Sequence, residues 1–140
     1  MKTIRETLES YRELKYDAMR LLKVYRRLHA EIGIGSVSYD GMPKGHSISS
    51  KTERDATKLA EAYKDYAERM TEAMQRMIEI ESLIDRVTDP RGRYVLHERY
   101  IELRSIDDIG LDDAINRCGR QARRYHDDAI AELEELNGTL

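Results

Sequence analysis

Four arginines lie within eight residues near the C-terminal end of the chain, in the stretch RCGRQARR at 117–124, and no acidic residue separates them. A guanidinium group presents a planar fork of N–H donors that pairs with phosphate oxygens or with the O6 and N7 atoms of guanine. A glutamine amide pairs with adenine in a similar way. The candidate contact residues for such an anionic partner are Arg117, Arg120, Gln121, Arg123, Arg124 and His126.

The chain as a whole is slightly acidic, so a polyanionic partner has to meet positive charge that is concentrated in one place. The 140 residues carry a formal net charge of −3. The acids that follow the arginine cluster, from Asp127 to Glu135, are expected further along the same helix. An arginine-rich helix start can also be an ordinary solvated face, and the sequence leaves that alternative open.

The composition favours long helices over sheets. Charged residues make up 36% of the chain, and there is no Phe, no Trp and only two Pro. The single cysteine, Cys118, excludes an internal disulfide and fits a reducing cytoplasm. No apolar run approaches the roughly 20 residues of a membrane span, and the first residues lack the apolar core of a signal peptide. We therefore expect a cytoplasmic protein without a membrane partner.

Two long segments carry apolar residues at a spacing of three or four, which is typical of helices that bury one face. The first segment runs from Met1 to about Ile32, and the second from Lys51 to Thr88. The Gly- and Ser-rich stretch between them, Gly33–Ser50, predicts a mobile loop. Helices this long need an antiparallel neighbour, a second copy of the chain, or both. The predicted buried positions are Ile4, Tyr11, Leu14, Ala18, Leu21, Tyr25, Leu28, Ile32, Ala56, Leu59, Tyr63, Tyr66, Met70, Ala73, Met77, Ile80, Ile84 and Val87.

The last fifty residues have the layout of a helix-turn-helix unit. Asp89 and Pro90 end the second long helix and begin the next, because proline suits a first helical turn. A short helical piece follows the capping residue Ser105, with Ile106, Ile109, Leu111 and Ile115 available for packing. The chain turns around Cys118, and the recognition helix is expected near 119–136. The sequence thus predicts an all-α protein: a long antiparallel, coiled-coil-like hairpin over 1–88, with its loop at 33–50, and a helix-turn-helix region over 89–140.

The region 83–133 resembles the C-terminal part of phage late-gene transcriptional regulators of the ArpU/RinA type, which carry a sigma-70 region-4-like helix-turn-helix. The GMPKG stretch at 41–45 is also similar to a loop that joins two helices in that family. The matching stretches are Asp89-Pro90-Arg91, Arg99-Tyr100-Ile101-Glu102, Ser105-Ile106-Asp107-Asp108-Ile109, Arg120-Gln121-Ala122-Arg123-Arg124-Tyr125-His126 and Ala129-Ile130 with Leu133.

The resemblance implies a DNA-binding transcriptional regulator, encoded by a phage or prophage and acting in the bacterial host cytoplasm. The expected partners are double-stranded DNA, further copies of the chain in a homo-oligomer, with a dimer favoured, and RNA polymerase or another partner, which the 33–50 loop could contact. We expect no enzymatic activity, because the sequence contains no acid–base or nucleophile constellation. It also contains no phosphate-binding glycine loop and no metal-ligand spacing, so no cofactor or metal is expected.

Two registers are open for the turn. If the Ser105–Ile109 stretch is matched to the family pattern, extra residues remain before Arg120 and Gly110 takes the place of a packed small residue. If the recognition helix is matched instead, Leu111 and Ile115 become core positions.

Two other functions compete with transcriptional regulation. One is a coiled-coil adaptor whose helix-turn-helix has degenerated, which the altered turn favours. The other is a DNA-recognition subunit of the small-terminase kind, which also joins helix-turn-helix units to oligomerising helices. A ring of many subunits would indicate the packaging role, whereas a dimer would indicate regulation.

Overall fold

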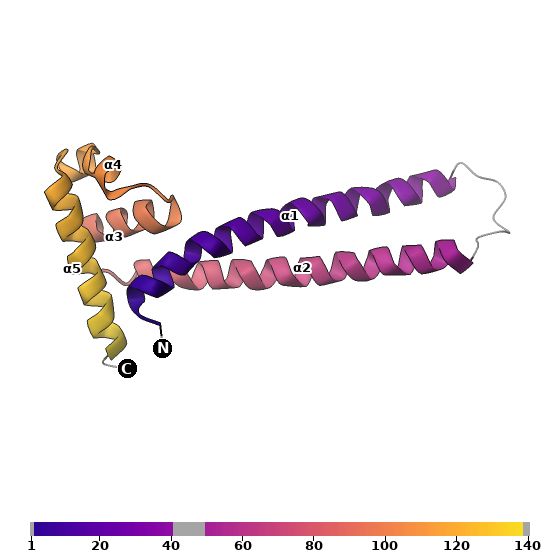
Figure 1. Cartoon of the computed structure of the whole chain (residues 1–140), viewed down its shortest axis with the longest axis horizontal. Coiled ribbons are helices and arrows are strands. Elements are labelled where there is room, and N and C mark those ends of the chain that lie inside the picture. The colour runs from indigo at the N-terminus through magenta and orange to yellow at the C-terminus, as the bar shows by residue number, and fades with distance from the viewer. Residues whose placement is uncertain (1, 41–49, 139–140) are drawn as a thin grey trace. The chain divides into compact units, whose positions relative to one another are not determined.

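The computed structural model is all-helical over the residues that it describes, which are 2–40 and 50–138 (Figure 1). Side chains are described for 2–31 and 53–138. No strand occurs within these ranges, so the predicted all-α class is confirmed. The elements are α1 (Ile4–Asp40), α2 (Ser50–Ile84), α3 (Pro90–Leu96), the π-helical turn η2 (His97–Ile101), α4 (Ile106–Gly110), the 3₁₀ turn η3 (Asp113–Ile115) and α5 (Gly119–Gly138).

The first long helix extends further than the sequence predicted. The helix α1 continues to Asp40, so the part of the expected loop from 33 to 40 is helical. The stretch 41–49 of that loop, with the GMPKG residues and the predicted contact with RNA polymerase, lies outside the described residues, and Ser50 is the first residue of α2.

The second long helix is shorter than predicted, because it ends at Ile84 rather than at Thr88. The N–H of Val87 donates to the carbonyl of Ile84 at 3.1 Å, three residues back, which tightens the chain into a turn. The turn directs the Val87 side chain into the core, where it is almost fully buried. The predicted burial of Val87 is therefore confirmed, although it arises outside the helix.

The described residues form two compact units. One unit comprises Tyr16–Met74, and the other comprises Met1–Lys15 together with Gln75–Leu140. The helices α1 and α2 each contribute residues to both units. The sequence-based division at residue 88 falls inside the second of these units, which we call the head unit; Tyr16–Met74 is called the stalk unit.

In the stalk unit, α1 and α2 lie side by side and antiparallel, as the hairpin prediction requires (Figure 1). The Tyr25 and Tyr63 hydroxyls are 2.7 Å apart, and their rings stack with centroids separated by 4.8 Å. Leu21, Leu28 and Ala73 are buried as predicted. The predicted stripe does not hold over its whole length, since the side chain at Ala56 is exposed.

The head unit is built around a core that draws on both ends of the chain. The hydroxyl of Tyr11 donates to Glu81 Oε1 at 2.8 Å, and Lys15 Nζ donates to the carbonyl of Ile101 at 2.9 Å. These bonds fix the first turns of α1 against the end of α2 and against η2. The buried members of this core are Ile4, Leu8, Tyr11, Ile80, Ile84, Val87, Leu96, Tyr100, Ile101, Ala129, Ile130 and Leu133.

Candidate nucleic-acid interface

Two side-chain caps start the helices that support the candidate interface, and both were predicted from the sequence. Asp89 accepts a hydrogen bond from the backbone N–H of Arg91 at 3.0 Å at the start of α3. Ser105 accepts from the N–H of Asp108 at 3.1 Å at the start of α4. Each cap satisfies a donor that the first helical turn leaves unpaired.

A small second core joins the short helices of the head unit to α5. It contains Val95 of α3, Ile109 of α4, Ile115 of η3 and Ala122 of α5, all of which are buried. The helix α5 packs against both α3 and α4. Each element contributes one central residue, so the three helices and the turn support one another as in a helix-turn-helix unit.

The contact between α4 and α5 shows which residues of the turn are packed and which are exposed. A Cβ placed on Gly110 would lie 2.7 Å from the Cα of Gly119, so the backbones of the two helices approach directly. Ile109 beside it is fully buried, whereas Leu111 is 68% exposed. The prediction that Leu111 packs in the core is therefore wrong, whereas Ile109 and Ile115 are both buried, as predicted.

The turn itself contains two consecutive residues in the left-handed region. Asn116 has a φ of 56° and Arg117 a φ of 54°. The N–H of Arg117 donates to the carbonyl of Asp112 at 3.2 Å, and the N–H of Cys118 donates to that of Ile115 at 3.3 Å. The turn is thus closed by backbone hydrogen bonds and brings α5 back onto α4.

A side-chain clamp, formed by Arg104, Tyr94 and Asp112, holds the loop before α4 to the turn after it. Arg104 donates to both carboxylate oxygens of Asp112, at 2.8 and 2.9 Å, and the hydroxyl of Tyr94 donates to the same carboxylate. These bonds, the one from Arg104 first, lower the pKa of Asp112 from its ordinary 3.8 to about 2. The bidentate geometry and the partial burial of both side chains make this the strongest ion pair near the turn.

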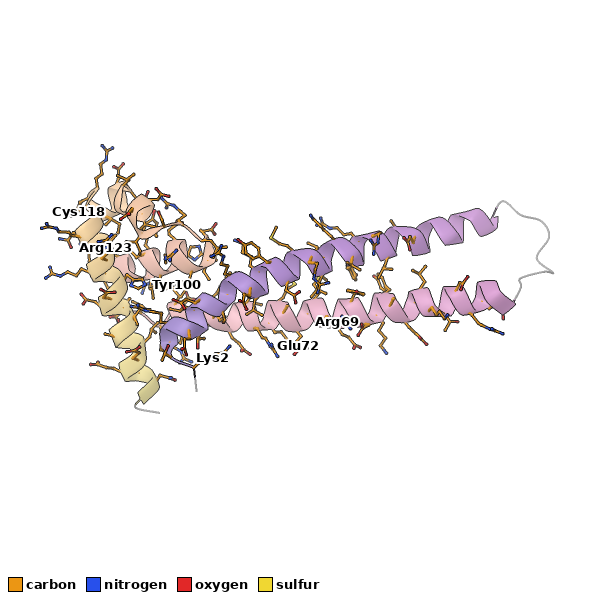
Figure 2. The ribbon with its side chains drawn as sticks, viewed as in Figure 1. Lys2, Arg69, Glu72, Tyr100, Cys118 and Arg123 are labelled. Carbon is orange, nitrogen blue, oxygen red and sulfur yellow. The ribbon has the colours of Figure 1, made fainter. Side chains whose placement is uncertain are left out.

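The predicted contact residues on α5 divide into an outer and an inner set. Arg120, Arg123 and Arg124 are exposed, and Gln121 is half-buried beside them. Figure 2 shows Arg123 projecting from the start of α5, with Cys118 in the preceding turn. Within the part of the chain that the structure describes, Arg120 and Arg124 have no ion pair or hydrogen bond from their side chains. Their guanidinium groups are therefore available to an external anion.

Two of the four arginines do have carboxylate partners. Arg117 Nε lies 3.0 Å from Asp113 Oδ1, and the two side chains are 75% and 88% exposed. Arg123 Nη2 lies 3.1 Å from Asp107 Oδ1, and these side chains are 67% and 80% exposed. Ion pairs this exposed contribute about 0–1 kcal/mol to stability, because water competes for both partners. A phosphate can therefore replace either carboxylate at little cost.

His126 belongs to the inner set, which corrects its assignment as a contact residue. It lies one helical turn beyond Ala122, on the buried face of α5, and is only 8% exposed. Its Nδ1 is 2.9 Å from Asp127 Oδ1, and its Nε2 is 2.6 Å from the hydroxyl of Tyr100. Since a carboxylate can only accept, Nδ1 donates to Asp127, and Nε2 is hydrogen-bonded to the Tyr100 hydroxyl. His126 therefore orders the core beneath the interface.

One exposed arginine that the sequence analysis did not include lies beside this surface. Arg91 Nη1 donates to the hydroxyl of Tyr125 at 3.2 Å, and the guanidinium carbon stands 5.9 Å from the centre of the tyrosine ring. Its position directly after Asp89-Pro90 was the available signal, because that motif places Arg91 in the first turn of α3.

Among the described residues, no group of three or more His, Cys, Asp or Glu side chains is arranged to hold a metal ion. No helix within the described ranges is both long and apolar enough to cross a membrane. Comparison with known proteins gave no match to this chain, whether with family models, curated proteins or solved structures.

Proposed function

We propose that this chain is a non-enzymatic, DNA-binding transcriptional regulator, encoded by a phage or prophage and acting in the bacterial host cytoplasm. The proposal combines the resemblance of residues 83–133 to the ArpU/RinA-type regulators with the geometry of the head unit. In this proposal α5 is the recognition helix, and it enters the major groove with its N-terminal end first.

The observation that carries the proposal is the division of α5 into two faces. Ala122, Ala129 and Leu133 bury one face against the rest of the head unit. Arg120 and Arg124 project from the opposite face, one helical turn apart, and no carboxylate among the described residues pairs with them. A helix that is supported on one side and cationic on the other fits the major groove, which is about 12 Å wide.

The charge along α5 changes from positive at its N-terminal end to negative further along, as docking by the N-terminal end requires. The arginines occupy the first turns, whereas the exposed acids Asp127 and Asp128 come afterwards. The acids would lie where the helix leaves the groove. Binding through several arginine–phosphate contacts should weaken steeply as salt concentration rises, because each contact releases condensed counterions.

The ion pairs of Arg117 and Arg123 favour a second candidate, a coiled-coil adaptor whose arginines only stabilise the turn. In that case the carboxylates of Asp107 and Asp113 would be permanent partners. Their high exposure argues against this role, since the pairs are weak and easily exchanged. The adaptor also gives no reason for the unpaired Arg120 and Arg124.

Assembly distinguishes regulation from DNA packaging. A homodimer, held by the stalk unit, would set the distance between two recognition helices and so match a two-fold symmetric DNA site. A small-terminase-like subunit would form a ring of many copies. Light scattering of the full chain, with and without a mixed pool of duplex DNA, separates these two outcomes.

The experiment that tests the proposal replaces Arg120 and Arg124 together with alanine and measures retention of duplex DNA in a gel-shift assay. We expect retention to be lost while circular dichroism stays helical, because neither side chain has a partner within the described fold. Arg27→Ala, which removes an exposed arginine of the stalk unit, is the matched control and should leave retention unchanged. Equal retention by the double variant and the control would remove α5 as the recognition helix.

A further inference from the structure

Arg91 differs from Arg117 and Arg123 because its side-chain partner is a tyrosine rather than a carboxylate. Its guanidinium is fixed by a phenol, through the hydrogen bond to the Tyr125 hydroxyl and its place over the ring. No described carboxylate forms an ion pair with it. The nearby Asp89 and Glu132 carboxylates instead accept from backbone N–H groups, those of Arg91 and Thr88. The guanidinium of Arg91 is therefore exposed and is not paired with a carboxylate of the described residues.

Tyr125 holds Arg91 on one side of α5, whereas Arg123 and its partner Asp107 lie on the other side. Residues two apart in a helix point about 200° from each other, so Tyr125 and Arg123 diverge around the axis. Tyr125 meets Arg91 of α3, whereas Arg123 meets Asp107 of α4. Arg120 and Arg124 project between these two flanks. The candidate interface thus has Arg120 and Arg124 at its centre, with Arg91 on one side and Arg123 on the other.

A helix in the major groove has a sugar–phosphate backbone on either side of it, and contacts to those phosphates position the helix without reading sequence. We propose that Arg91 is a phosphate-binding residue that contacts one DNA strand while Arg123 contacts the other. This inference rests on the proposed function and deepens it, because it separates the groups that set affinity from those that read bases. In this division, Arg120, Gln121 and Arg124 face the groove floor.

The role of Tyr125 is to position the arginine. The phenol uses one N–H of the guanidinium and leaves the other donors for phosphate oxygens. Because the ring also packs against the small core of Val95 and Ile109, the guanidinium is held relative to α5. A phosphate contact made by a held side chain loses less conformational entropy on binding than one made by a free side chain.

The test measures binding of a labelled random-sequence duplex by fluorescence anisotropy over a range of salt concentrations. Arg91→Ala should weaken binding about five- to tenfold at roughly 0.1 M salt and reduce the slope of log K against log salt by about 0.9. Arg91→Lys keeps the charge and should retain the wild-type slope. Tyr125→Phe removes only the hydroxyl and should weaken binding less than Arg91→Ala does. Arg27→Ala is the matched control, and circular dichroism checks that each variant is folded.

The outcomes separate this inference from the proposed function. If the wild-type chain does not bind duplex DNA at all, the proposed function fails. If it binds, and the Arg120/Arg124 variant loses binding while Arg91→Ala keeps the wild-type affinity and slope, only the phosphate role of Arg91 is overturned. A weaker Arg91→Ala with an unchanged salt slope, and no recovery in Arg91→Lys, would also overturn it, since the side chain would then act by packing. Losses that are equal across unrelated duplex sequences support it.

Discussion

Gly110 at the end of α4 rests directly on the backbone of Gly119 at the start of α5, where a Cβ on Gly110 would come within 2.7 Å of the Gly119 Cα. Backbone atoms cannot move aside as a flexible side chain can. Gly110→Ala should therefore push α4 away from α5 and destabilise the protein by about 1–3 kcal/mol, as overpacked cores do. Urea unfolding followed by circular dichroism measures the change.

Gly119→Ala is the matched control for that prediction. A Cβ on Gly119 would meet nothing within 4 Å, and neither glycine has a positive φ. Alanine at 119 should therefore be neutral or stabilise the protein by up to about 1 kcal/mol, because it restricts the unfolded chain. If the two alanine variants had equal stability, the close approach of α4 and α5 would be refuted.

The packing of the turn predicts opposite outcomes for two aliphatic residues on either side of Gly110. Ile109 is fully buried in the small core, so Ile109→Ala should cost about 2–5 kcal/mol through lost burial and a cavity. Leu111 is 68% exposed, so Leu111→Ala should change the free energy of unfolding by no more than about 0.5 kcal/mol. A larger loss for Leu111→Ala than for Ile109→Ala would contradict this packing of the turn.

The Arg104–Asp112 clamp predicts an acid-sensitive contribution to stability. Folding lowers the pKa of Asp112 from 3.8 to about 2, so the folded state binds this proton less tightly than the unfolded state does. The stabilisation is complete above the unfolded pKa and is lost as pH falls through the folded pKa. Thermal unfolding of wild type and Asp112→Asn should therefore differ above pH 3.8 and converge toward pH 2.

Two further variants show that this convergence comes from the clamp. Tyr94→Phe removes one of the two side chains that donate to Asp112, so it should give part of the Asp112→Asn effect. Arg104→Lys loses the bidentate geometry and should reproduce a larger part of the Asp112→Asn stability loss than Tyr94→Phe does. Arg104 is the larger cause of the lowered pKa of Asp112. A constant difference between wild type and Asp112→Asn down to pH 2 would contradict this account.

The helix α2 offers a matched pair for testing core packing and self-association separately. Ile80 is buried in the large core, so Ile80→Glu should cost at least about 3 kcal/mol by placing an unpaired carboxylate there. Ile78 is 58% exposed, so Ile78→Glu should keep its helicity. If a second copy of the chain covers Ile78, the Ile78 variant alone should remain folded but lose mass in light scattering. Unfolding of the Ile78 variant would contradict the exposure of that side chain.

Local sequence signals predicted the starts of elements well. Asp89-Pro90 and Ser105 act within one helical turn, and the structure contains both caps. A further cap at the start of α1 followed the same rule but was not identified: Thr3 and Glu6 exchange hydrogen bonds of 2.9 and 3.1 Å. Caps depend on residues close in sequence, which is why they can be predicted.

Burial that depends on several neighbours was harder to predict. Leu8 is fully buried although it was not among the predicted buried positions, because the start of α1 belongs to a core that α2 shares with the C-terminal helices. His126 was included among the candidate contact residues, but the packing of α5 places it on the buried face. Arg91 was missed because its relation to Tyr125 joins residues 34 positions apart. Such relationships depend on the tertiary arrangement rather than on spacing.

The paired left-handed residues at Asn116 and Arg117 also bear on how this kind of domain tolerates insertions. Because the backbone reverses there, we expect that residues can be added before α5 while Ile115 and Ala122 keep their places in the small core. A longer connection of this kind would keep the packing of α5 against α4. Variation in length should accordingly concentrate between Gly110 and Gly119, and stop at the two glycines that touch.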